Sequence, residues 1–241
     1  MDICRKITGL EKRDGFTLVH TNSCDIKLVF VTDEIVRVRA SFDKELAEES
    51  YILMTTAWAD RLDPLFEGQR TRLTPVEPKF TDGEKTLVFE TKALRLELDK
   101  DPICIRLYDA DGTELYSTLT GSPFTLDTNR RVTAYSRMQE DDCFYGFGEK
   151  AGALNKNKAF LRERATDAMG YDAELMDTLY KHIPFYIRLS HGSKKAGASS
   201  TTTSMSPCST WARKNPTTGP ATPTGRPTAA TSTSSFSAAI R

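Results

Sequence analysis

The sequence lacks an excess of charge of either sign. It holds 33 Lys and Arg residues against 33 Asp and Glu residues, so its formal net charge is zero. Proteins that bind nucleic acid or an anionic membrane surface usually carry a basic patch or a basic excess. The balance therefore argues against both kinds of partner and leaves a small or uncharged ligand as the better fit.

The sequence also lacks long apolar runs and paired cysteine motifs. No segment approaches the roughly 18 apolar residues of a membrane span, and the start, MDICRKITGLEKRDG, has no apolar signal-peptide core. The five cysteines form no CxxC pair and have no histidine at metal-ligand spacing. They are Cys4, Cys24, Cys104, Cys143 and Cys208. We expect a soluble, cytoplasmic protein with reduced thiols and no cofactor.

Composition divides the chain into a body and a tail. Residues 1–196 use every residue type, whereas residues 197–241 contain 9 Ser, 11 Thr, 7 Ala and 5 Pro and no Asp, Glu, Leu, Val or Tyr. Such a segment cannot bury enough apolar surface to offset the chain entropy lost on ordering. We therefore expect one folded domain over residues 1–196 and a disordered tail from Gly197 onward.

The composition of the tail has two interpretations. One is a natural flexible or glycosylated stalk. The other is a shift of reading frame near Ala196, because Ser, Thr, Ala and Pro codons share a middle cytosine and a cytosine-rich gene read one base out of step yields them together. The restored frame permits an apolar and aromatic series typical of a β protein. We favour the frame shift, and the DNA sequence is its direct check.

Apolar and polar residues alternate with a period of two over residues 15–144, which places alternate side chains on one face of a strand. The runs Lys27–Thr32 and Ile35–Ala40 surround a turn at residues 33–34, and Asp111-Gly112 closes a hairpin. The alternating apolar positions of residues 94–107 are Leu94, Leu96, Leu98, Ile103, Ile105 and Leu107. This pattern predicts an all-β fold, an antiparallel β-sandwich, with residues 42–54 as a candidate short helix.

The stretch FYGFGEKAGALNK, residues 144–156, looks at first like a phosphate-binding loop. Its glycines, Gly146, Gly148 and Gly152, are spaced G-x-G-x-x-x-G, whereas a dinucleotide site needs G-x-G-x-x-G between a strand and a helix. The Asn-Lys-Asn of residues 155–157 does not favour a helix. We therefore predict no phosphate or nucleotide site here.

Metal-binding patterns are weak. The hexapeptide DADGTE begins like a calcium loop, but Glu114 stands where that loop needs glycine, so a hairpin turn is the better interpretation. The histidines, His20, His182 and His191, are far apart and have no Cys or carboxylate at ligand spacing. We expect no metal site.

Candidate nucleophiles and acid pairs are no stronger. Cys143 has no evident base beside it, which argues against a catalytic thiol. The adjacent acids Asp141 and Asp142 would point to opposite faces of a strand. We interpret them as solvated charges.

The segment Cys143–Leu189 is more informative. An aromatic strand and a glycine turn are followed by a polar loop and a second strand, HIPFYIRL. A loop of about 30 residues between two strands of a compact domain is usually functional. This one holds acidic and aromatic side chains of the kind that bind sugar hydroxyls, namely Asp167, Tyr171, Asp172 and Asp177.

Two blocks in this segment, FYGFGEKAGALNK and TDAMGYDAELMDTLYKHIPFYI, resemble the N-terminal domain of glycoside hydrolase family 31, the α-glucosidase and α-xylosidase family. EIVRVRASF and the hairpin around DADGTELYS are similar to it as well, so the resemblance spans residues 15–193. It implies a β-sandwich like that of galactose mutarotase, placed before a (β/α)8 barrel that hydrolyses α-glycosides with retention. We expect the barrel to be absent from this chain.

The resemblance also implies a binding role for the loop. In the family, a Thr-Asp or Arg-Asp pair on this loop contacts the sugar whose bond is cleaved. Thr166 and Asp167 match that pair, with Asp167 as the carboxylate that binds hydroxyls. The family often has Trp-Asn just before it, where this sequence has Arg164-Ala165, so the substrate preference stays open.

The catalytic residues are expected elsewhere. Retaining hydrolysis needs two carboxyl groups about 5–5.5 Å apart, and in the family both lie on the barrel. None of the acids in this chain matches either of them, so we assign no catalytic residue here. We expect the chain alone to be inactive.

The leading expectation is the N-terminal portion of an α-glucosidase-like hydrolase acting on an α-linked glucoside or oligosaccharide. A non-catalytic carbohydrate-binding or interaction module is the alternative. A mutarotase-like epimerase is a third, but that chemistry needs a His and a carboxylate as acid and base, which the scattered histidines do not favour. A shared fold alone does not support it.

Overall fold

The protein is described by a computed structural model that covers residues 1–44, 50–51, 53–66, 68–162, 165–170, 172, 174, 179–190, 195–203, 208–210 and 234–240. These residues form β-strands and a four-residue 3-10 helix, η1 (Asp63–Phe66). Among them, no helix has the length and apolarity needed to cross a membrane. The predicted all-β class is confirmed.

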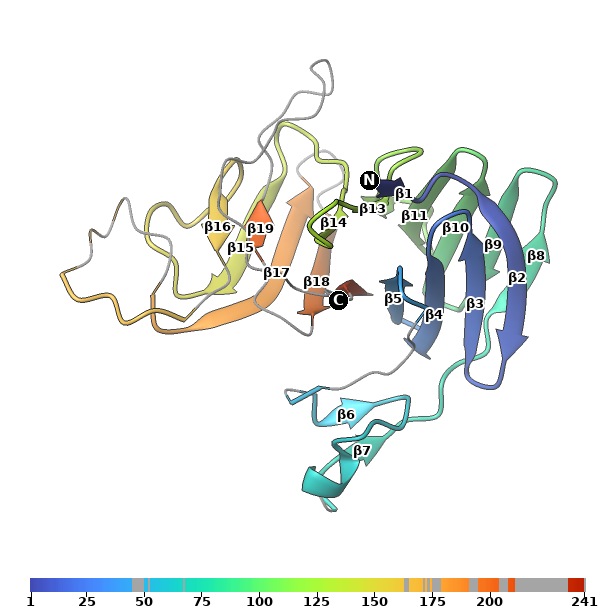
Figure 1. Cartoon of the computed structure of the whole chain (residues 1–241), viewed down its shortest axis with the longest axis horizontal. Coiled ribbons are helices and arrows are strands. Elements are labelled where there is room, and N and C mark those ends of the chain that lie inside the picture. The colour runs from blue at the N-terminus through green and yellow to red at the C-terminus, as the bar shows by residue number, and fades with distance from the viewer. Residues whose placement is uncertain are drawn as a thin grey trace.

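The larger sheet has eight strands in the order β15-β17-β18-β20-β5-β4-β3-β2, and all neighbouring pairs are antiparallel. It crosses both halves of the molecule (Figure 1). Its strands are β2 (Ile7–Arg13), β3 (Phe16–Thr21), β4 (Asp25–Thr32), β5 (Ile35–Ser41), β15 (Cys143–Gly148), β17 (His182–Ser190), β18 (Lys195–Thr203) and β20 (Ser234–Ile240).

A second, five-stranded antiparallel sheet, in the order β12-β11-β10-β9-β8, packs against the β2–β5 part of the first (Figure 1). Its strands are β8 (Lys79–Asp82), β9 (Thr86–Glu90), β10 (Leu94–Lys100), β11 (Ile103–Asp109) and β12 (Glu114–Ser117). The two sheets are the layers of the predicted sandwich.

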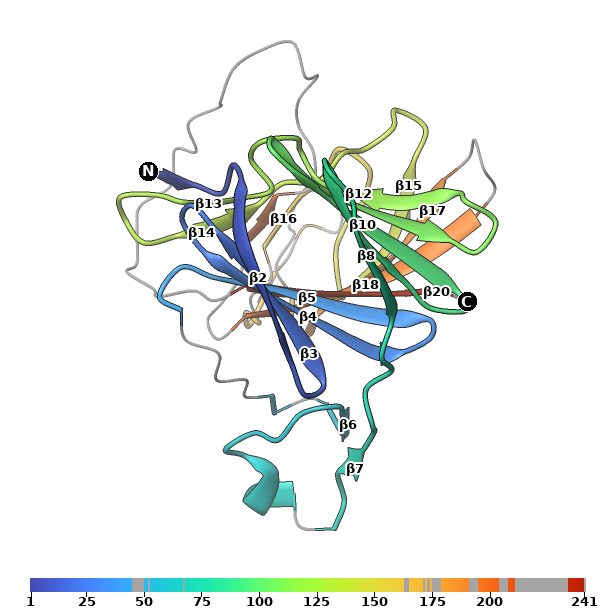
Figure 2. The same ribbon diagram turned by 90° about the vertical axis from the view of Figure 1, so that its right-hand side faces the viewer.

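Three small sheets complete the described fold. They are the trio β1 (Asp2–Ile3), β13 (Phe124–Leu126) and β14 (Val132–Ala134), the pair β16 (Phe160–Arg162) and β19 (Cys208–Thr210), and the parallel pair β6 (Thr55–Thr56) and β7 (Thr71–Arg72). The pair β6 and β7 lies with η1 in a lobe that projects from the sandwich (Figure 2).

The core lies where the period-two pattern predicts it. All six alternating apolar positions of residues 94–107 are buried, with exposed fractions of 2% or less. Leu98 pairs with Ile105 on one side and with Leu87 on the other. These side chains meet those of β4 and β5, including Leu28 and Val38, in one continuous cluster. Cys104, which alternates with Ile103 and Ile105 and so lies on the opposite face of β11, is buried as well.

The structure differs from the predicted tail where it describes that segment. The boundary after Ala196 falls inside β18, which runs to Thr203, and Ser199 is buried. The strands β19 and β20 also lie beyond Gly197. A strand ladder uses the N–H and C=O groups that every residue except proline carries, so a Ser- and Thr-rich segment can join a sheet despite its small side chains.

Other parts of the predictions lie outside the described residues. These are residues 204–207, 211–233 and 241 of the tail and residues 45–49 and 52 of the candidate helix. The described residues around that candidate form no helix.

Leu98→Ala tests the sandwich core. The side chain is fully buried between neighbouring strands, so we expect a loss of about 2–5 kcal/mol in the free energy of unfolding, from lost apolar burial and a residual cavity. Urea denaturation measures it. Leu154→Ala is the matched control, because Leu154 is 79% exposed and its loss should change stability by less than about 0.5 kcal/mol. Equal losses would contradict the proposed core.

Candidate functional site

The segment 149–181 leaves the sheet after β15 and returns to it at β17. Both strands come so close here that side chains do not fit. A Cβ on Gly146 would lie 2.6 Å from the Phe185 carbonyl oxygen, and one on Gly148 would lie 2.7 Å from the Lys181 carbonyl oxygen. Gly146 and Gly148 therefore allow the two backbones to come into contact.

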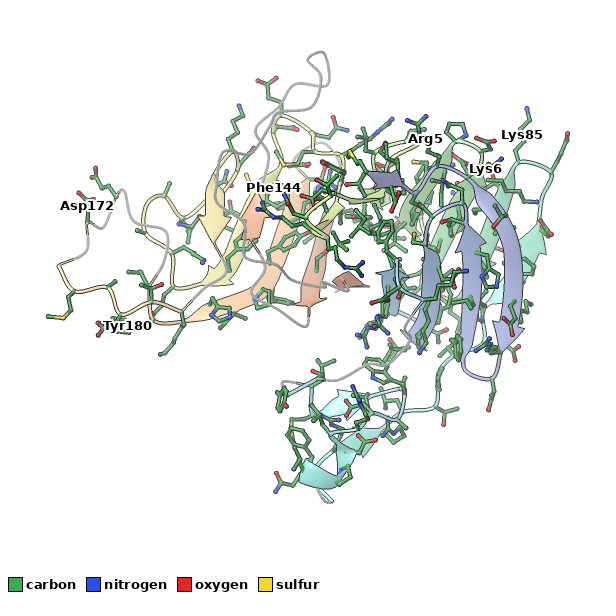
Figure 3. All side chains as sticks on the ribbon, in the orientation of Figure 1. Arg5, Lys6, Lys85, Phe144, Asp172 and Tyr180 are labelled. Carbon is green, nitrogen blue, oxygen red and sulfur yellow. The ribbon has the colours of Figure 1, made fainter. Side chains whose placement is uncertain are left out.

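A β-bulge lies at the same point. The register between β15 and β17 shifts between Gly146 and Gly148, and Phe147 has a φ of +70°. Its ring is buried and stacks on Tyr186, with 5.2 Å between ring centroids and 10° between planes. Together with Phe144 and Leu161 these rings form a second apolar cluster, in the part of the molecule where Figure 3 labels Phe144. The bulge turns Phe147 into that cluster and aims the chain into the loop.

The Asn-Lys-Asn of residues 155–157 holds the loop in place. The Asn155 Oδ1 accepts a hydrogen bond from the Phe144 amide at 3.0 Å. The buried Lys156 Nζ donates to the carbonyl oxygens of Ala151 at 2.8 Å and Lys150 at 3.3 Å. Burial, and then the charge of Lys150, lower the pKa of Lys156. An ammonium committed to backbone carbonyls leaves no support for phosphate binding.

The two ends of the loop are joined by hydrogen bonds. The Glu149 amide donates to the Lys181 carbonyl at 2.8 Å, and the Lys181 amide donates to Glu149 Oε2 at 3.1 Å. Further along, the Thr166 amide donates to the Leu179 carbonyl at 2.9 Å. The outward and returning arms therefore lie side by side.

The predicted binding pair lies at this junction. Asp167 is exposed, and its Oδ1 accepts a hydrogen bond from the Tyr180 hydroxyl at 2.8 Å. That bond raises the pKa of Tyr180, because ionisation of the phenol would break it beside a carboxylate. Tyr180 is 57% exposed and lies at the end of the molecule farthest from β2 (Figure 3). The structure thus brings a carboxylate and an aromatic ring together on an accessible surface.

Sequence reasoning missed Tyr180 and the Glu149–Lys181 junction. The signal for Tyr180 was its place just before the strand HIPFYIRL, directly after the polar loop. Of the other acidic and aromatic candidates, Asp172 is exposed and its Oδ1 accepts from the Glu174 amide at 2.8 Å. Tyr171, Asp177, His191 and Arg164 lie outside the described residues.

Asp142 corrects one expectation. It is fully buried, whereas Asp141 is exposed as predicted for both. Its Oδ2 lies 2.6 Å from Arg188 Nη2 and accepts from the Gln139 amide at 2.8 Å. A buried carboxylate is tolerable when paired in this way. Arg188 is on β17, far from Asp142 in the sequence. The sequence around Asp141 and Asp142 therefore could not reveal that Asp142 is buried against this arginine.

The hairpin turn predicted for DADGTE is confirmed, and its two aspartates bind a lysine of the same chain. Gly112 takes a φ of +81° at the turn. Lys195 Nζ lies 2.9 Å from Asp109 Oδ2 and 2.7 Å from Asp111 Oδ2. These two hydrogen bonds raise the pKa of Lys195 to about 12. The acids that imitate a calcium loop thus bind an ammonium of β18.

The described residues also contain a close pair of carboxylates in the lobe near η1. Asp60 Oδ2 and Asp63 Oδ1 each lie 2.8 Å from Arg70 Nη1. A backbone hydrogen bond from Asp60, and then Arg70, lower the pKa of Asp63. Both carboxylates are bound to one guanidinium, so this pair is suited to holding the lobe together. In the described part of the chain, no three His, Cys, Asp or Glu side chains gather as metal ligands do.

Gly148→Ala tests the close approach of β15 and β17. Alanine there meets both an unfavourable φ of +78° and backbone atoms at 2.7 Å. We expect a loss of stability about 1–3 kcal/mol larger than that of Gly112→Ala. Gly112 is the control, because its φ is +81° but a Cβ on it meets nothing within 4 Å. Chemical denaturation measures both, and equal losses would show that the clash is absent.

Asp167→Asn tests the contact with Tyr180. Removing the carboxylate charge should move the Tyr180 pKa down toward its ordinary value, because the phenol loses its charged acceptor. An NMR pH titration of ring-labelled tyrosines reads it out. Asp172→Asn, an exposed acid of the same loop, should leave the Tyr180 pKa unchanged. A Tyr180 pKa that does not respond to Asp167→Asn would rule out the hydrogen bond.

Two solved structures named as GH31 enzymes have a similar fold. A Flavobacterium johnsoniae GH31 dextranase complexed with isomaltotriose matches all of this chain and 27% of its own chain, with a TM-score of 0.71 and 16% identity. A GH31 α-xylosidase from a soil metagenome, complexed with xylose, matches 97% of this chain and 32% of its own, with a TM-score of 0.64 and 11% identity.

Sequence comparison agrees with the fold. Alpha-glucosidase 2 of Bacillus thermoamyloliquefaciens is 28% identical over 175 residues, which are 72% of this chain and 20% of that protein. The chain thus spans about a fifth of the length of this curated relative. Residues 25–204 match the model of the glycosyl hydrolase 31 N-terminal galactose mutarotase-like domain. The chain therefore belongs to that domain family, as the resemblance of its loop blocks predicted.

Proposed function

We propose that this chain is the N-terminal portion of an α-glucosidase-like glycoside hydrolase that acts with retention on α-linked glucosides or oligosaccharides. Its part in that reaction is to bind sugar through the loop of residues 149–181. The observation that carries this proposal is the exposed Asp167 carboxylate held by Tyr180 at the loop junction. Membership of the family and the similarity to an α-glucosidase and a dextranase support the substrate class.

Asp167 and Thr166 are suited to hydroxyl binding. A carboxylate accepts hydrogen bonds from adjacent sugar hydroxyls, and an aromatic ring covers the apolar face of a sugar. Tyr180 supplies that ring and fixes the Asp167 Oδ1 at the same time. Neither group needs a cofactor.

The chemistry of bond cleavage is assigned to a part of the protein beyond this domain. Among the described acids, Asp142 is bound to Arg188, Asp109 to Lys195, and Asp60 shares Arg70 with Asp63. Carboxylates paired with cations are poor general acids at neutral pH. The chain alone is therefore expected to show no turnover.

An apolar stripe next to the loop supports a covering domain. Ile183, Phe185 and Ile187 alternate along β17 and are 53%, 41% and 41% exposed. They face away from the buried Tyr186. Contiguous apolar side chains at a surface commonly mark a contact with another protein part. A catalytic domain seated here would lie beside Asp167.

A non-catalytic carbohydrate-binding module is the second candidate. The specific observation in its favour is that Asp167 and Tyr180 are already joined and exposed in this chain. In that case sugar binding would not require a further domain.

Calorimetry and a hydrolysis assay separate these functions. We expect no release of the aryl group from an aryl α-glucoside and no binding of maltose or isomaltose at millimolar concentrations, because one carboxylate and one aromatic ring supply only part of a sugar site. Millimolar binding that Asp167→Ala abolishes and Asp172→Ala retains would favour the module. No binding favours a loop that needs a second domain. Turnover that disappears in Asp167→Ala would overturn the assignment of catalysis elsewhere.

A further inference from the structure

The segment after β1 is fastened to the turn between β3 and β4. The Asn22 Oδ1 accepts hydrogen bonds from the amides of Arg5 at 2.8 Å and Lys6 at 3.0 Å, and its Nδ2 donates to the Ile3 carbonyl at 2.9 Å. The Asn22 amide donates to the Lys6 carbonyl at 3.1 Å. Figure 3 labels Arg5 and Lys6 at this end of the sandwich. Asn22 thus holds the first residues of the chain against the turn, and we call this set of hydrogen bonds the Asn22 clasp.

Two buried cysteines, Cys4 and Cys24, flank the Asn22 clasp in the sequence. Cys4 and Cys24 are 0% and 1% exposed and lie in the same cluster of buried side chains, where each thiol shifts the pKa of the other. The Thr21 hydroxyl lies 3.5 Å from Cys24 Sγ. The Cys4 amide donates to the Phe124 carbonyl at 3.0 Å, which fixes the backbone of Cys4 beside β13.

The pair is unlike the other described cysteines. Cys104 is buried with its thiol against the Thr118 carbonyl, and Cys143 lies beside Asn155 and the Asp141 carbonyl. The four cysteines whose side chains the structure describes are free thiols, and among them Cys4 and Cys24 shift the pKa of one another. Two buried thiols that share one cluster, on a turn and on the chain segment hydrogen-bonded to that turn, are the arrangement in which a disulfide can be sought.

We propose that Cys4 and Cys24 are a redox pair that closes an intrachain disulfide when a peroxide or a low-molecular-weight disulfide oxidises the protein. The bond would join the N-terminal segment covalently to the β3–β4 turn.

The electronic roles of the two thiols differ. The hydrogen bond from Cys24 and that of Thr21 lower the pKa of Cys4 against the opposing effect of burial, whereas the bond to Cys4 and burial raise the pKa of Cys24. The thiolate is the nucleophile, so Cys4 attacks first. Its sulfur breaks the O–O bond of hydrogen peroxide and becomes a sulfenic acid, and the released hydroxide takes a proton to form water.

Cys24 then resolves the sulfenic acid. Its sulfur attacks the Cys4 sulfur, the S–S bond forms, and the hydroxyl group leaves as water with the proton of the Cys24 thiol. Two thiols lose two electrons in total, and one peroxide is reduced to two waters. With a low-molecular-weight disulfide, the Cys4 thiolate attacks one sulfur, breaks the small S–S bond and releases one small thiol, which leaves a mixed disulfide. The Cys24 sulfur then attacks the Cys4 sulfur and releases the second small thiol.

Access of the oxidant depends on opening of the chain end. Both sulfurs are buried, so residues 1–6 must separate from Asn22 before a peroxide reaches Cys4. Terminal segments open more readily than the core of a sheet. Weakening the Asn22 clasp should therefore accelerate oxidation.

Peptide mapping of the oxidised wild-type chain is the direct test. After treatment with hydrogen peroxide or oxidised glutathione, denaturation and alkylation, we expect a Cys4–Cys24 cross-linked peptide and two fewer alkylated thiols. The thermal midpoint should rise by several degrees, because the cross-link restricts the unfolded chain. Cys104→Ser should keep both effects, and Cys4→Ser and Cys24→Ser should each lose them.

A second variant tests the route. Asn22→Ala should form the same cross-link several times faster, because the clasp that shields Cys4 is lost. The proposal is overturned if Cys4 accumulates as sulfinic acid without a link to Cys24. It is also overturned if another cysteine pair forms first, or if no link appears at oxidant doses that convert a small-molecule thiol completely.

Discussion

The contact between the backbones of β15 and β17 determines where the loop of residues 149–181 begins and ends. At Gly146 and Gly148 a Cβ would overlap with backbone atoms of the neighbouring strand. The strands can therefore meet only with glycine at these places, and the bulge between them directs Phe147 into the second apolar cluster. The position of Asp167 follows from this geometry, because the arms that carry Asp167 and Tyr180 continue from these two strands.

The sandwich could be predicted from the sequence because burial in strands has a local signature. The alternation at Leu94, Leu96 and Leu98 requires no knowledge of partners, and the structure buries all three. Long-range pairing leaves no such signature. Asp142 is paired with Arg188, which lies on another strand. The two adjacent acids alone therefore could not predict this buried ion pair.

The candidate site was also predictable only in part. Asp167 was found by its resemblance to a family pair, and its role stays a proposal. The contact with Tyr180 depends on how two arms of a loop return to each other. The strands of the tail were missed for a different reason, since composition reports side-chain burial while β18 is joined to its neighbours through the backbone.

A hydrogen bond within the loop also separates the length of its outer part from the stability of the sheet. The Thr166 amide and the Leu179 carbonyl close that outer part, so the chain between these two residues can lengthen or shorten without moving β15 or β17. Loop-closure entropy grows slowly, by about 0.6 kcal/mol for each doubling of length. Evolution can therefore reshape the surface offered to a sugar by insertion and deletion, and protein engineers can graft foreign loops between the same two anchor residues.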